Sequence, residues 1–462
     1  MQSYLYICTL IINIGTIKIR NEKVKVLKFG GTSVGSAQRM KEVAKLITDG
    51  EQKIVVLSAM SGTTNTLVEI SDYLYKKNPE GANEIINRLE AKYKQHVNEL
   101  YSTDEYKQKT QEFIKAQFDY IRSYTKDIFT LFEEKVILAQ GELISTNMVT
   151  NYLQEQGVNA ILLPALEFMR TDKNSEPDPV YIKEKLAAQL EIHPDAEIYI
   201  TQGFICRNAY GEIDNLQRGG SDYTASLIGA AVNASEIQIW TDIDGMHDND
   251  PRIVDKTSPV RHLHFEEAAE LAYFGAKILH PTCVQPAKYA NIPVRLLNTM
   301  EPTAPGTLIS NDTEKGKIKA VAAKDNITAI KIKSSRMLLA HGFLRKVFEI
   351  FESYQTSIDM ICTSEVGVSV SIDNTKHLNE ILDDLKKYGT VTVDQDMCII
   401  CVVGDLEWEN VGFEAKALDA MRDIPVRMIS FGGSNYNISF LIREEDKKKA
   451  LQSLSDHLFN NK

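Results

Sequence analysis

The sequence predicts an α/β protein, a three-layer sandwich around a largely parallel sheet, followed by two smaller α+β modules. Short, continuously apolar runs alternate with helical segments up to about residue 300, as expected for parallel strands covered on both faces. After the Pro- and Gly-containing connector EPTAPGTLIS, one order of elements occurs twice, each time over about 65 residues. The 462 residues are long enough for about three domains and a large core.

The strands and helices of the sandwich follow one another from residue 24. A Gly-Gly turn and a helix from about Ser36 follow the first strand. Residues 82–140 contain neither Gly nor Pro, which favours long charged helices, except that KVILAQ reads as a strand. That strand would lead through a turn at Gly141 into a helix that ends at Gly157. The runs predicted as strands are residues 24–29, 53–60, 135–140, 159–165, 197–205 and 236–242.

The last 150 residues or so contain an internal duplication. The first copy reads NITAIKIK, FLRKVFEIFESYQ, SIDMICTS and VGVSVSID. The second reads MCIICVVG, FEAKALDAMRD, PVRMISFG and NYNISFLI, before a final helix. Both copies predict strand, helix, strand, strand, helix. We therefore expect four segments: an N-terminal extension (1–22), the α/β domain (23–310) and two modules (311–393 and 394–462).

Composition narrows the class of function. The net charge of −11 argues against a nucleic-acid partner. The apolar stretch YLYICTLIINIG near the N-terminus is too short to span a membrane and lacks the features of a signal peptide, so we expect a loose tail or a misassigned start. Six cysteines do not form a disulfide framework, and Cys398 and Cys401 would face opposite sides of one strand. A cytoplasmic location fits these observations, and no membrane association is expected.

Two glycine-rich junctions carry the first candidate chemistry. Lys28 ends a strand beside Gly30 and Gly31, where exposed N–H groups and an ammonium group could hold a phosphate; the alternative is a tight structural turn. The pattern is neither a P-loop nor a dinucleotide-binding fingerprint. The stretch RGGSD, residues 218–222, precedes a helix, and its Arg218 could clamp a carboxylate. The alternative there is a capping cluster.

Further candidates are single residues whose meaning depends on their neighbours. Glu142 could pair with a substrate ammonium group or simply complement a helix N-terminus. TDIDGMHDNDPR has four Asp within nine residues, but its Gly is misplaced for a calcium loop, so a nucleotide-contacting loop or a solvated acidic loop remains. The histidines in RHLHF alternate as on a strand and are read as non-catalytic. No metal site is predicted.

Taken together these motifs resemble the aspartokinase family, which phosphorylates the β-carboxylate of aspartate. The match rests on KFGGTSVGS, LSAMSGTTN, GELIS, TQGFI, RGGSDYTA, WTDIDG, DPR and FEEAAELAYFGAKILHP in family order. The duplicated part resembles paired ACT modules, which are ferredoxin-like βαββαβ units that sense amino acids. MLLAHGFLRKVFEIF and SIDMICTSE are most similar to the monofunctional, lysine-inhibited bacterial class. The chain ends after the second module, so we expect no homoserine dehydrogenase part.

The resemblance implies a role for each matching position. ATP, with Mg²⁺ bound mainly through its phosphates, and L-aspartate would be the substrates, with Lys28, Asp222 and Lys277 as the catalytic groups. The aspartate site would comprise Ser58, Thr64, Glu142, Phe204, Arg218 and Ser221. The nucleotide site would comprise Lys28, Gly30, Gly31, Thr241, Asp242, His247, Arg252 and Lys277.

Regulation by L-lysine is the corresponding expectation for the modules. The effector site would comprise Met337, Phe343, Leu344, Ser357, Asp359, Ser364 and Glu365. A homodimer through the ACT modules is expected, with a tetramer as a further form when effector is bound. Gln217, His247, Ala340 and His341 depart from the family pattern. Two rival hypotheses are a related amino-acid kinase with another acceptor and a non-catalytic amino-acid sensor.

Overall fold

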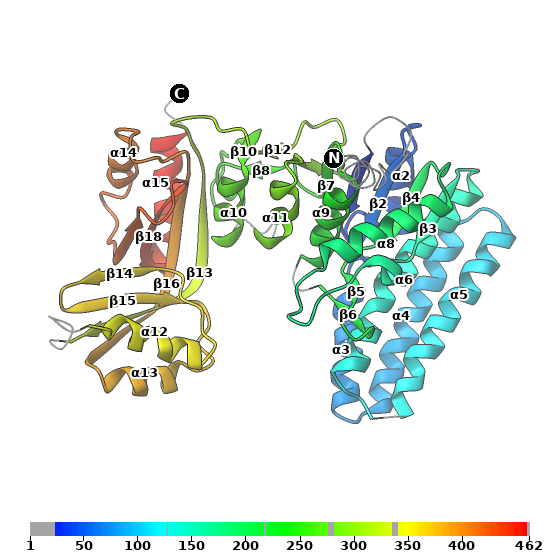
Figure 1. Ribbon diagram of the computed structural model, residues 1–462, viewed down its shortest axis with the longest axis horizontal. Coiled ribbons are helices and arrows are strands. Elements are labelled where there is room, and N and C mark those ends of the chain that lie inside the picture. Colours follow the sequence, from blue (N-terminus) through cyan, green and yellow to red (C-terminus); the bar gives the residue numbers. More distant parts are fainter. Residues whose placement is uncertain (1–23, 127, 217–218, 276–280, 335–340, 460–462) are drawn as a thin grey trace, which may run out of the picture. The chain divides into compact units, whose positions relative to one another are not determined.

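The computed structural model describes residues 24–126, 128–216, 219–275, 281–334 and 341–459 (Figure 1). The chain forms two compact units. Unit 1 comprises Met1–Gly245 and Thr282–Asn311, and unit 2 comprises Met246–Pro281 and Asp312–Lys462. The predicted N-terminal extension lies outside the described residues. The segment 246–281, which we expected within the α/β domain, groups with unit 2.

Unit 1 alternates strands and helices along the chain. Its strands are β1 (Lys25–Phe29), β2 (Lys53–Leu57), β3 (Ala160–Leu163), β4 (Ile198–Gln202), β5 (Ile205–Arg207), β6 (Ile213–Asn215), β7 (Ile237–Thr241), β11 (Val294–Asn298) and β12 (Thr307–Ser310). Its helices are α2 (Ala37–Ile47), α3 (Thr63–Tyr75), α4 (Pro79–Leu100), α5 (Asp104–Ser123), α6 (Leu131–Glu155), α7 (Ala165–Phe168), α8 (Pro179–Ile192), α9 (Gly220–Val232) and α11 (Pro281–Tyr289).

The sheet of unit 1 is almost entirely parallel. Its strands follow the order β12-β11-β7-β1-β2-β4-β3, and only the pair β11 and β12 is antiparallel. The central strand β1 lies between β2 and β7, with Lys28 opposite Val56 and Ile239. Because parallel strands end at one edge of a sheet, the loops after β1, β2, β4 and β7 open at the same edge.

Side chains alternate between two covered faces of this sheet. On one face Leu27, Phe29, Val55 and Leu57 join a buried cluster with the apolar sides of α2 to α6. Helix α9 packs on the opposite face, against β1, β2 and β7. In Figure 1 the long helices α4, α5 and α6 run side by side on the first face. The predicted three-layer sandwich is confirmed.

One predicted strand is wrong. KVILAQ and the supposed turn at Gly141 both lie inside the 25-residue helix α6, which starts at a capping box formed by Thr130 and Glu133. The helix is buried along most of its second half, so its sequence shows neither a clear apolar stripe nor a polar face. Gly141 does not mark a turn but close packing, since a Cβ there would lie 2.7 Å from the Cβ of Ala59.

Unit 2 contains the duplicated modules and the segment 246–281. Its strands are β8 (Met246–His247), β9 (Pro259–Val260), β10 (His262–His264), β13 (Ile318–Lys333), β14 (Ile361–Ser364), β15 (Gly367–Ile372), β16 (Thr390–Gly404), β17 (Met428–Phe431) and β18 (Asn437–Arg443). Its helices are α10 (Phe265–Tyr273), α12 (Phe343–Ser353), α13 (Leu378–Lys386), α14 (Phe413–Ala420) and α15 (Lys447–Leu458). The expected order of elements is present in both copies.

Two long strands, β13 and β16, run through both modules (Figure 1). The sheet order is β14-β15-β13-β16-β18-β17. The second half of β13 packs with α12 and α13 in one core, and the first half packs with α14 and α15 in another. The ladder shifts register where Asn326 and Asp396 adopt positive φ angles of 59° and 54°. The first half of β13 therefore completes the sheet of the second module.

Two smaller features of unit 2 concern its cysteines and histidines. Cys398 and Cys401 are buried in β16 as free thiols, and burial raises the pKa of both. His264 caps α10 by accepting a hydrogen bond from the backbone N–H of Glu266, which is a structural role. Among the helices of the described ranges, none combines the length and the apolar character needed to cross a bilayer.

Candidate active site

Lys28 and Asp222 form the charged centre of a cavity in unit 1. Lys28 lies near the end of β1, and Asp222 lies in the first turn of α9. Their side chains pair at 2.6 Å between Nζ and Oδ1, and each side chain is 12% exposed. Lys28 faces α9 because side chains alternate along β1. The pair leaves the Lys28 ammonium group at the cavity surface, where it can contact an anionic ligand as well.

The start of α9 has the geometry predicted from GGSD. Gly219 precedes the helix with φ of 76°, a left-handed conformation that suits glycine. Gly220 has no room for a side chain, since a Cβ would lie 2.7 Å from the Phe204 ring. Phe204 itself has φ of 69°, which is rare for a bulky residue and marks a strained turn at the cavity. The N–H groups of this helix start are available to an anion.

Glu142 projects into the same cavity from the middle of α6, not from the strand–helix junction that we predicted. Its Oε1 accepts a hydrogen bond from the Ala59 N–H at 3.1 Å, whereas Oε2 is buried with no hydrogen-bond partner among the described residues. Burial raises the pKa of this carboxyl to about 8, although the backbone N–H groups of Ala59 and Glu142 oppose the shift. A cationic ligand group would satisfy Oε2 and favour the ionised form.

Two further buried contacts hold this wall of the cavity. The Thr63 hydroxyl and the Tyr93 hydroxyl lie 2.9 Å apart, and Tyr93 is a buried residue of α4 that faces the start of α3. The Ser145 hydroxyl donates to the Ser58 carbonyl at 2.8 Å, which ties α6 to the loop after β2. Sequence reasoning missed Thr63, Tyr93 and Ser145, because only their position behind Glu142 gives them a role.

The cavity has a volume of about 370 Å³ and gathers all five of the described residues predicted for aspartate. It brings together parts of four loops after β1, β2, β4 and β6 with the middle of α6. The predicted residues in its lining are Lys28, Gly31, Ser58, Thr64, Glu142, Phe204, Ser221 and Asp222. The lining also includes Ala59, Met60, Ser61, Gly62, Asn65, Gly219 and Gly220, of which the aspartate prediction had named none.

The residues predicted for the nucleotide divide between the units. Gly30 N–H donates to the Trp240 carbonyl at 3.3 Å, so of the two predicted glycine amides that of Gly31 is left for a phosphate. In unit 1 Thr241 ends β7, and its hydroxyl donates a 3.1 Å hydrogen bond to the carboxylate of Asp242, the next residue. His247 and Arg252 belong to unit 2: His247 Nδ1 lies 2.9 Å from the Thr257 hydroxyl, and the exposed Arg252 pairs with Asp250.

A second buried carboxylate, Asp359, lies among the residues predicted for the effector in unit 2. Its Oδ1 accepts from Lys324 Nζ at 2.6 Å and from the Tyr273 hydroxyl at 2.8 Å, and its Oδ2 is buried with no hydrogen-bond partner among the described residues. Lys324 also pairs with Asp373 at 2.9 Å. Burial raises the pKa of Asp359 although Lys324 opposes the shift; the pKa of Lys324 is raised too, since both carboxylates outweigh its burial.

The other described residues predicted for the effector belong to α12, to β14 and to the loops next to β14. Phe343 is the buried first residue of α12 and Leu344 is 37% exposed beside it. Ser364 ends β14 and Glu365 follows in the turn to β15, while Ser357 precedes β14 in a loop. Predictions for Arg218, Gln217, Lys277, Met337 and Ala340 concern residues that lie outside the described ranges.

Comparisons with known proteins identify the family. The model of the amino acid kinase family matches residues 23–298, and an ACT domain model matches residues 400–458. Aspartokinase 1 of Arabidopsis thaliana, a chloroplast protein, is 35% identical over 465 residues, which cover 94% of this chain and 80% of the relative. The chain belongs to the aspartokinase family.

Solved aspartokinase structures agree with this assignment over nearly the whole length. Aspartokinase III of Escherichia coli in complex with aspartate and ADP, in its R-state, has a TM-score of 0.82 and 32% identity, covering 95% of this chain and 100% of the other. The same enzyme in complex with lysine and aspartate, in its T-state, has a TM-score of 0.79 and 33% identity, covering 94% and 99%. The aspartokinase family thus accounts for both units.

Proposed function

We propose that this aspartokinase transfers the γ-phosphoryl group of ATP to the β-carboxylate of L-aspartate, forming 4-phospho-L-aspartate and ADP. The observation that carries the proposal is that one cavity contains both a carboxylate suited to a cation and an ammonium group suited to an anion. Glu142 offers a buried carboxylate oxygen that has no hydrogen-bond partner among the described residues, and Lys28 offers an ammonium group next to a helix start. An amino acid with a carboxylate in its side chain has an ammonium group that can pair with Glu142 and carboxylates that can approach Lys28 and the helix start. The reaction would begin the synthesis of lysine, threonine and methionine.

Aspartate binding rests on groups of both charges. Its ammonium group would lie against Glu142 Oε2, where it replaces the missing hydrogen-bond donor. Ser221, at the start of α9, and Arg218 would hold a carboxylate, with Ser58, Thr64 and Phe204 shaping the remaining wall. The strained turn at Phe204 presses against the helix start and so fixes its N–H groups in place.

Phosphoryl transfer needs little more than positioning, because the attacking carboxylate is already a nucleophile. Lys28, Lys277 and the Gly31 amide would stabilise charge on the phosphoryl group. Asp222 holds the Lys28 ammonium group in place through the 2.6 Å ion pair. Mg²⁺ would be carried mainly by the ATP phosphates, since Asp222 is the carboxylate beside Lys28 and it is already paired. Thr241, Asp242, His247 and Arg252 are the proposed nucleotide contacts.

Inhibition by L-lysine is the proposed regulation. The support comes from Asp359, whose Oδ2 could accept a hydrogen bond from an effector ammonium group. Phe343, Leu344 and Glu365, with Ser357, Ser364 and Met337, complete the proposed site. Tyr273 ends α10, four residues before Lys277, and donates to Asp359. A ligand that changes the contacts of Asp359 would therefore act on the segment leading to a proposed catalytic lysine.

Assembly and location follow from surface and redox features. The edge strand β14 and the neighbouring helix α12 expose Ile361, Leu344 and Phe348 by 37–41%, which favours a homodimer through the modules, or a tetramer when effector is bound. Light scattering with and without lysine distinguishes these forms. The free cysteines favour a reducing cytoplasm as the site of action.

The proposal is tested by an ATP- and Mg²⁺-dependent hydroxamate assay with aspartate, with and without lysine, and with threonine as the control effector. We expect turnover that lysine alone suppresses. Turnover with another amino acid but not with aspartate would replace the acceptor. No phosphoryl transfer to any amino acid would favour a sensor.

Lys28→Ala should lower kcat by about a thousandfold, because the main positive charge near the phosphoryl group is lost. We expect the melting temperature to fall only moderately: the nearly buried Asp222 loses its cation, but both side chains lie at the cavity surface. Lys25→Ala is the matched control: it removes another lysine of β1, which pairs with Glu51 outside the cavity. Near-normal turnover of the Lys28 variant would contradict the proposed role.

A further inference from the structure

The two modules of unit 2 carry corresponding residues at corresponding places. Asp359 and Arg427 each directly precede a methionine, and each backbone N–H donates to a strand carbonyl, at Ser371 and Leu441 respectively. Those carbonyls lie two residues before Asp373 and Arg443.

The long strands show the same relation. Lys324 and Asp394 each lie two residues before the positions with positive φ, Asn326 and Asp396. A cluster of three charged side chains therefore occurs once in each module. It comprises Lys324, Asp359 and Asp373 in the first module and Asp394, Arg427 and Arg443 in the second.

The charges of the second cluster are the reverse of those of the first. In the first module the cation Lys324 lies between two carboxylates, at 2.6 Å from Asp359 and 2.9 Å from Asp373. In the second, Asp394 pairs with Arg427 through Nε at 2.8 Å, and Arg443, which pairs with the exposed Glu445 at 3.3 Å, takes the place of the second carboxylate. A cluster with an excess of carboxylates suits a cationic ligand group, and one with an excess of guanidinium groups suits an anionic group.

The two clusters also differ in what covers them. In the first module the Tyr273 hydroxyl bonds to Asp359 and its ring lies 4.4 Å from the Lys324 ammonium group. In the second module the corresponding place is a groove of about 1030 Å³. Its lining includes three short segments, residues 393–397 of β16, 425–427 before β17, and 443–445 at the end of β18. The groove therefore has room for a small molecule where the first module has a tyrosine side chain.

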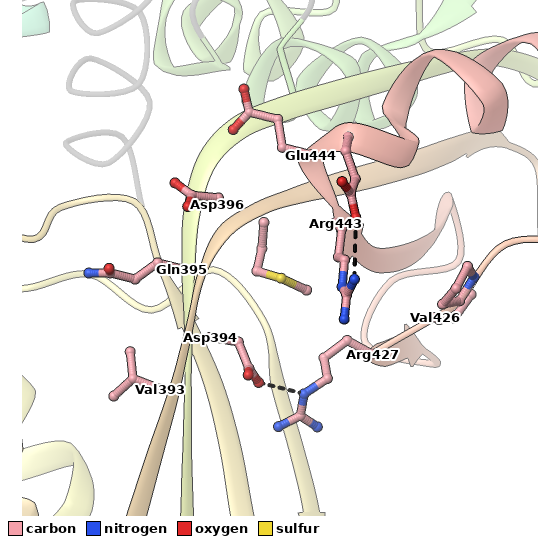
Figure 2. A pocket seen from close by; sticks show the side chains of 11 residues that line it. Val393, Asp394, Gln395, Asp396, Val426, Arg427, Arg443 and Glu444 are labelled. Carbon is pink, nitrogen blue, oxygen red and sulfur yellow. Dashed lines mark hydrogen bonds and ion pairs between the residues drawn. The ribbon is translucent and has the colours of Figure 1, made fainter.

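The two guanidinium groups and the carboxylates of Asp396 and Glu444 lie at different parts of this groove. Figure 2 shows Arg427 reaching Asp394 at one end, Arg443 pointing into the middle, and the carboxylates of Asp396 and Glu444 toward the other end. The Arg427 bond to Asp394 uses Nε, and within the described chain its two Nη groups form no hydrogen bond. Those Nη groups form the planar face that binds a carboxylate with two parallel hydrogen bonds.

We propose that this groove binds a small molecule through a carboxylate group, held by Arg427 and Arg443. Asp396 and Glu444 could take an ammonium group at the other end, so the ligand could be a zwitterionic amino acid or a dicarboxylate. The site is separate from the proposed lysine site, which contains Asp359, and from the aspartate cavity of unit 1. It does not depend on the proposed catalytic activity.

Calorimetric titration of the full chain tests this proposal. The chain is first saturated with ADP, aspartate and lysine, so that only a further site can bind the probe. The probes are glycine, L-valine and L-methionine as zwitterions, succinate and glutarate as dicarboxylates, L-valinamide as a control without carboxylate, and inorganic phosphate. We expect binding of one molecule per chain for at least one carboxylate probe and no binding of L-valinamide. The probe class that binds distinguishes the two sources of the carboxylate.

Variants locate the binding. Arg427→Gln should raise the Kd of the binding probe about tenfold or more, and Arg443→Gln by a smaller factor. Arg443 is 69% exposed, so its variant remains informative if replacement of Arg427 disturbs folding. Arg422→Gln is the matched control, because Arg422 is a 73% exposed arginine of the same module that pairs with Asp419 and does not line the groove. No binding of any carboxylate, equal Kd values in all variants, or tighter binding of phosphate or L-valinamide would overturn the proposal.

Discussion

The cavity proposed for aspartate in unit 1 and the region proposed for the effector in unit 2 each contain a buried carboxylate, and the two carboxylates differ in their partners. Glu142 is 3% exposed and accepts one backbone hydrogen bond, and among the described residues no cation pairs with it. The Asp359 side chain is 1% exposed, and it already has Lys324 and Tyr273 on one oxygen. Each keeps its second oxygen buried and without a partner among the residues described.

This difference separates a preformed substrate site from a regulated one. A carboxylate without a counter-charge disfavours its own ionised form, so a ligand cation gains the full electrostatic benefit of pairing with it. A carboxylate with an internal cation has already gained most of that benefit. A second cation must then bind beside Lys324 or displace it. We expect strong dependence on Glu142 for substrate and a weaker, tunable dependence on Asp359 for effector.

Glu142→Gln is the change that should have the largest effect on this comparison. The amide preserves the size of the side chain but removes the charge that pairs with the substrate ammonium group. We expect the KM for aspartate to rise about a hundredfold, with a smaller change in the KM for ATP. Steady-state kinetics with each substrate varied in turn measures both values.

Glu90→Gln provides the matched control for that experiment. Glu90 is also a buried carboxylate, but it already pairs with Lys94 and Arg122 and does not line the cavity. We expect its KM for aspartate to match the unaltered chain. Equal KM values for Glu142→Gln and the unaltered chain would mean that the substrate ammonium group binds elsewhere.

Lys324→Met should have a smaller and opposite effect, on the effector. Removal of the internal cation leaves Asp359 with only Tyr273, so a lysine ammonium group meets less repulsion and a stronger partner. We expect the lysine concentration for half inhibition to fall about tenfold. The melting temperature without lysine should fall as well, because a buried carboxylate has lost its cation, and lysine should restore part of it.

Lys319→Met is the control on the same strand. Lys319 is also a buried lysine of β13, but it pairs with Glu314 and the His262 carbonyl. Its replacement should destabilise unit 2 without altering the lysine concentration for half inhibition. If Lys324→Met requires as much lysine as the unaltered chain, or more, Lys324 does not compete with the effector.

Sequence patterns predicted most of the fold because most elements follow their local chemistry. The parallel strands of unit 1 appear as short apolar runs, and the duplication appears as a repeated order of elements. Helix α6 was misread because it is buried on nearly every side, which removes the periodic stripe. The sequence did not show that the first half of β13 completes the sheet of the second module, because its partner strand β16 lies about 80 residues later and such distant pairing leaves no local signal.

The candidate site was predicted in part, and for a clear reason. Lys28, Glu142, Ser221 and Asp222 belong to motifs, and the structure brings them into one cavity. No motif points to a site role for Tyr93 or Tyr273. Tertiary packing alone places Tyr93 behind Glu142 and the Tyr273 hydroxyl against Asp359. The charge reversal between Asp359 and Arg427 is visible in the sequence, but only the structure shows that the two positions correspond.

The smallest expected effect concerns how pH changes stability through Glu142. Its pKa is raised from 4.5 to about 8 in the folded chain, so the folded state holds this proton more tightly than the unfolded state. The stability that Glu142 contributes is therefore complete below pH 4.5 and is lost as the pH rises toward 8. The side chain of the Glu142→Gln variant cannot ionise, so the variant does not lose stability in this way as the pH rises. We expect its melting temperature, relative to the unaltered chain, to increase by a few degrees between pH 5 and pH 8 and then to level off.

Saturating aspartate should reduce this difference in scanning calorimetry, since the substrate ammonium group stabilises the ionised Glu142 that the variant lacks. A difference that stays constant from pH 5 to pH 8 would mean that Glu142 ionises in the folded chain without a ligand, and the contrast with Asp359 would then rest on geometry alone.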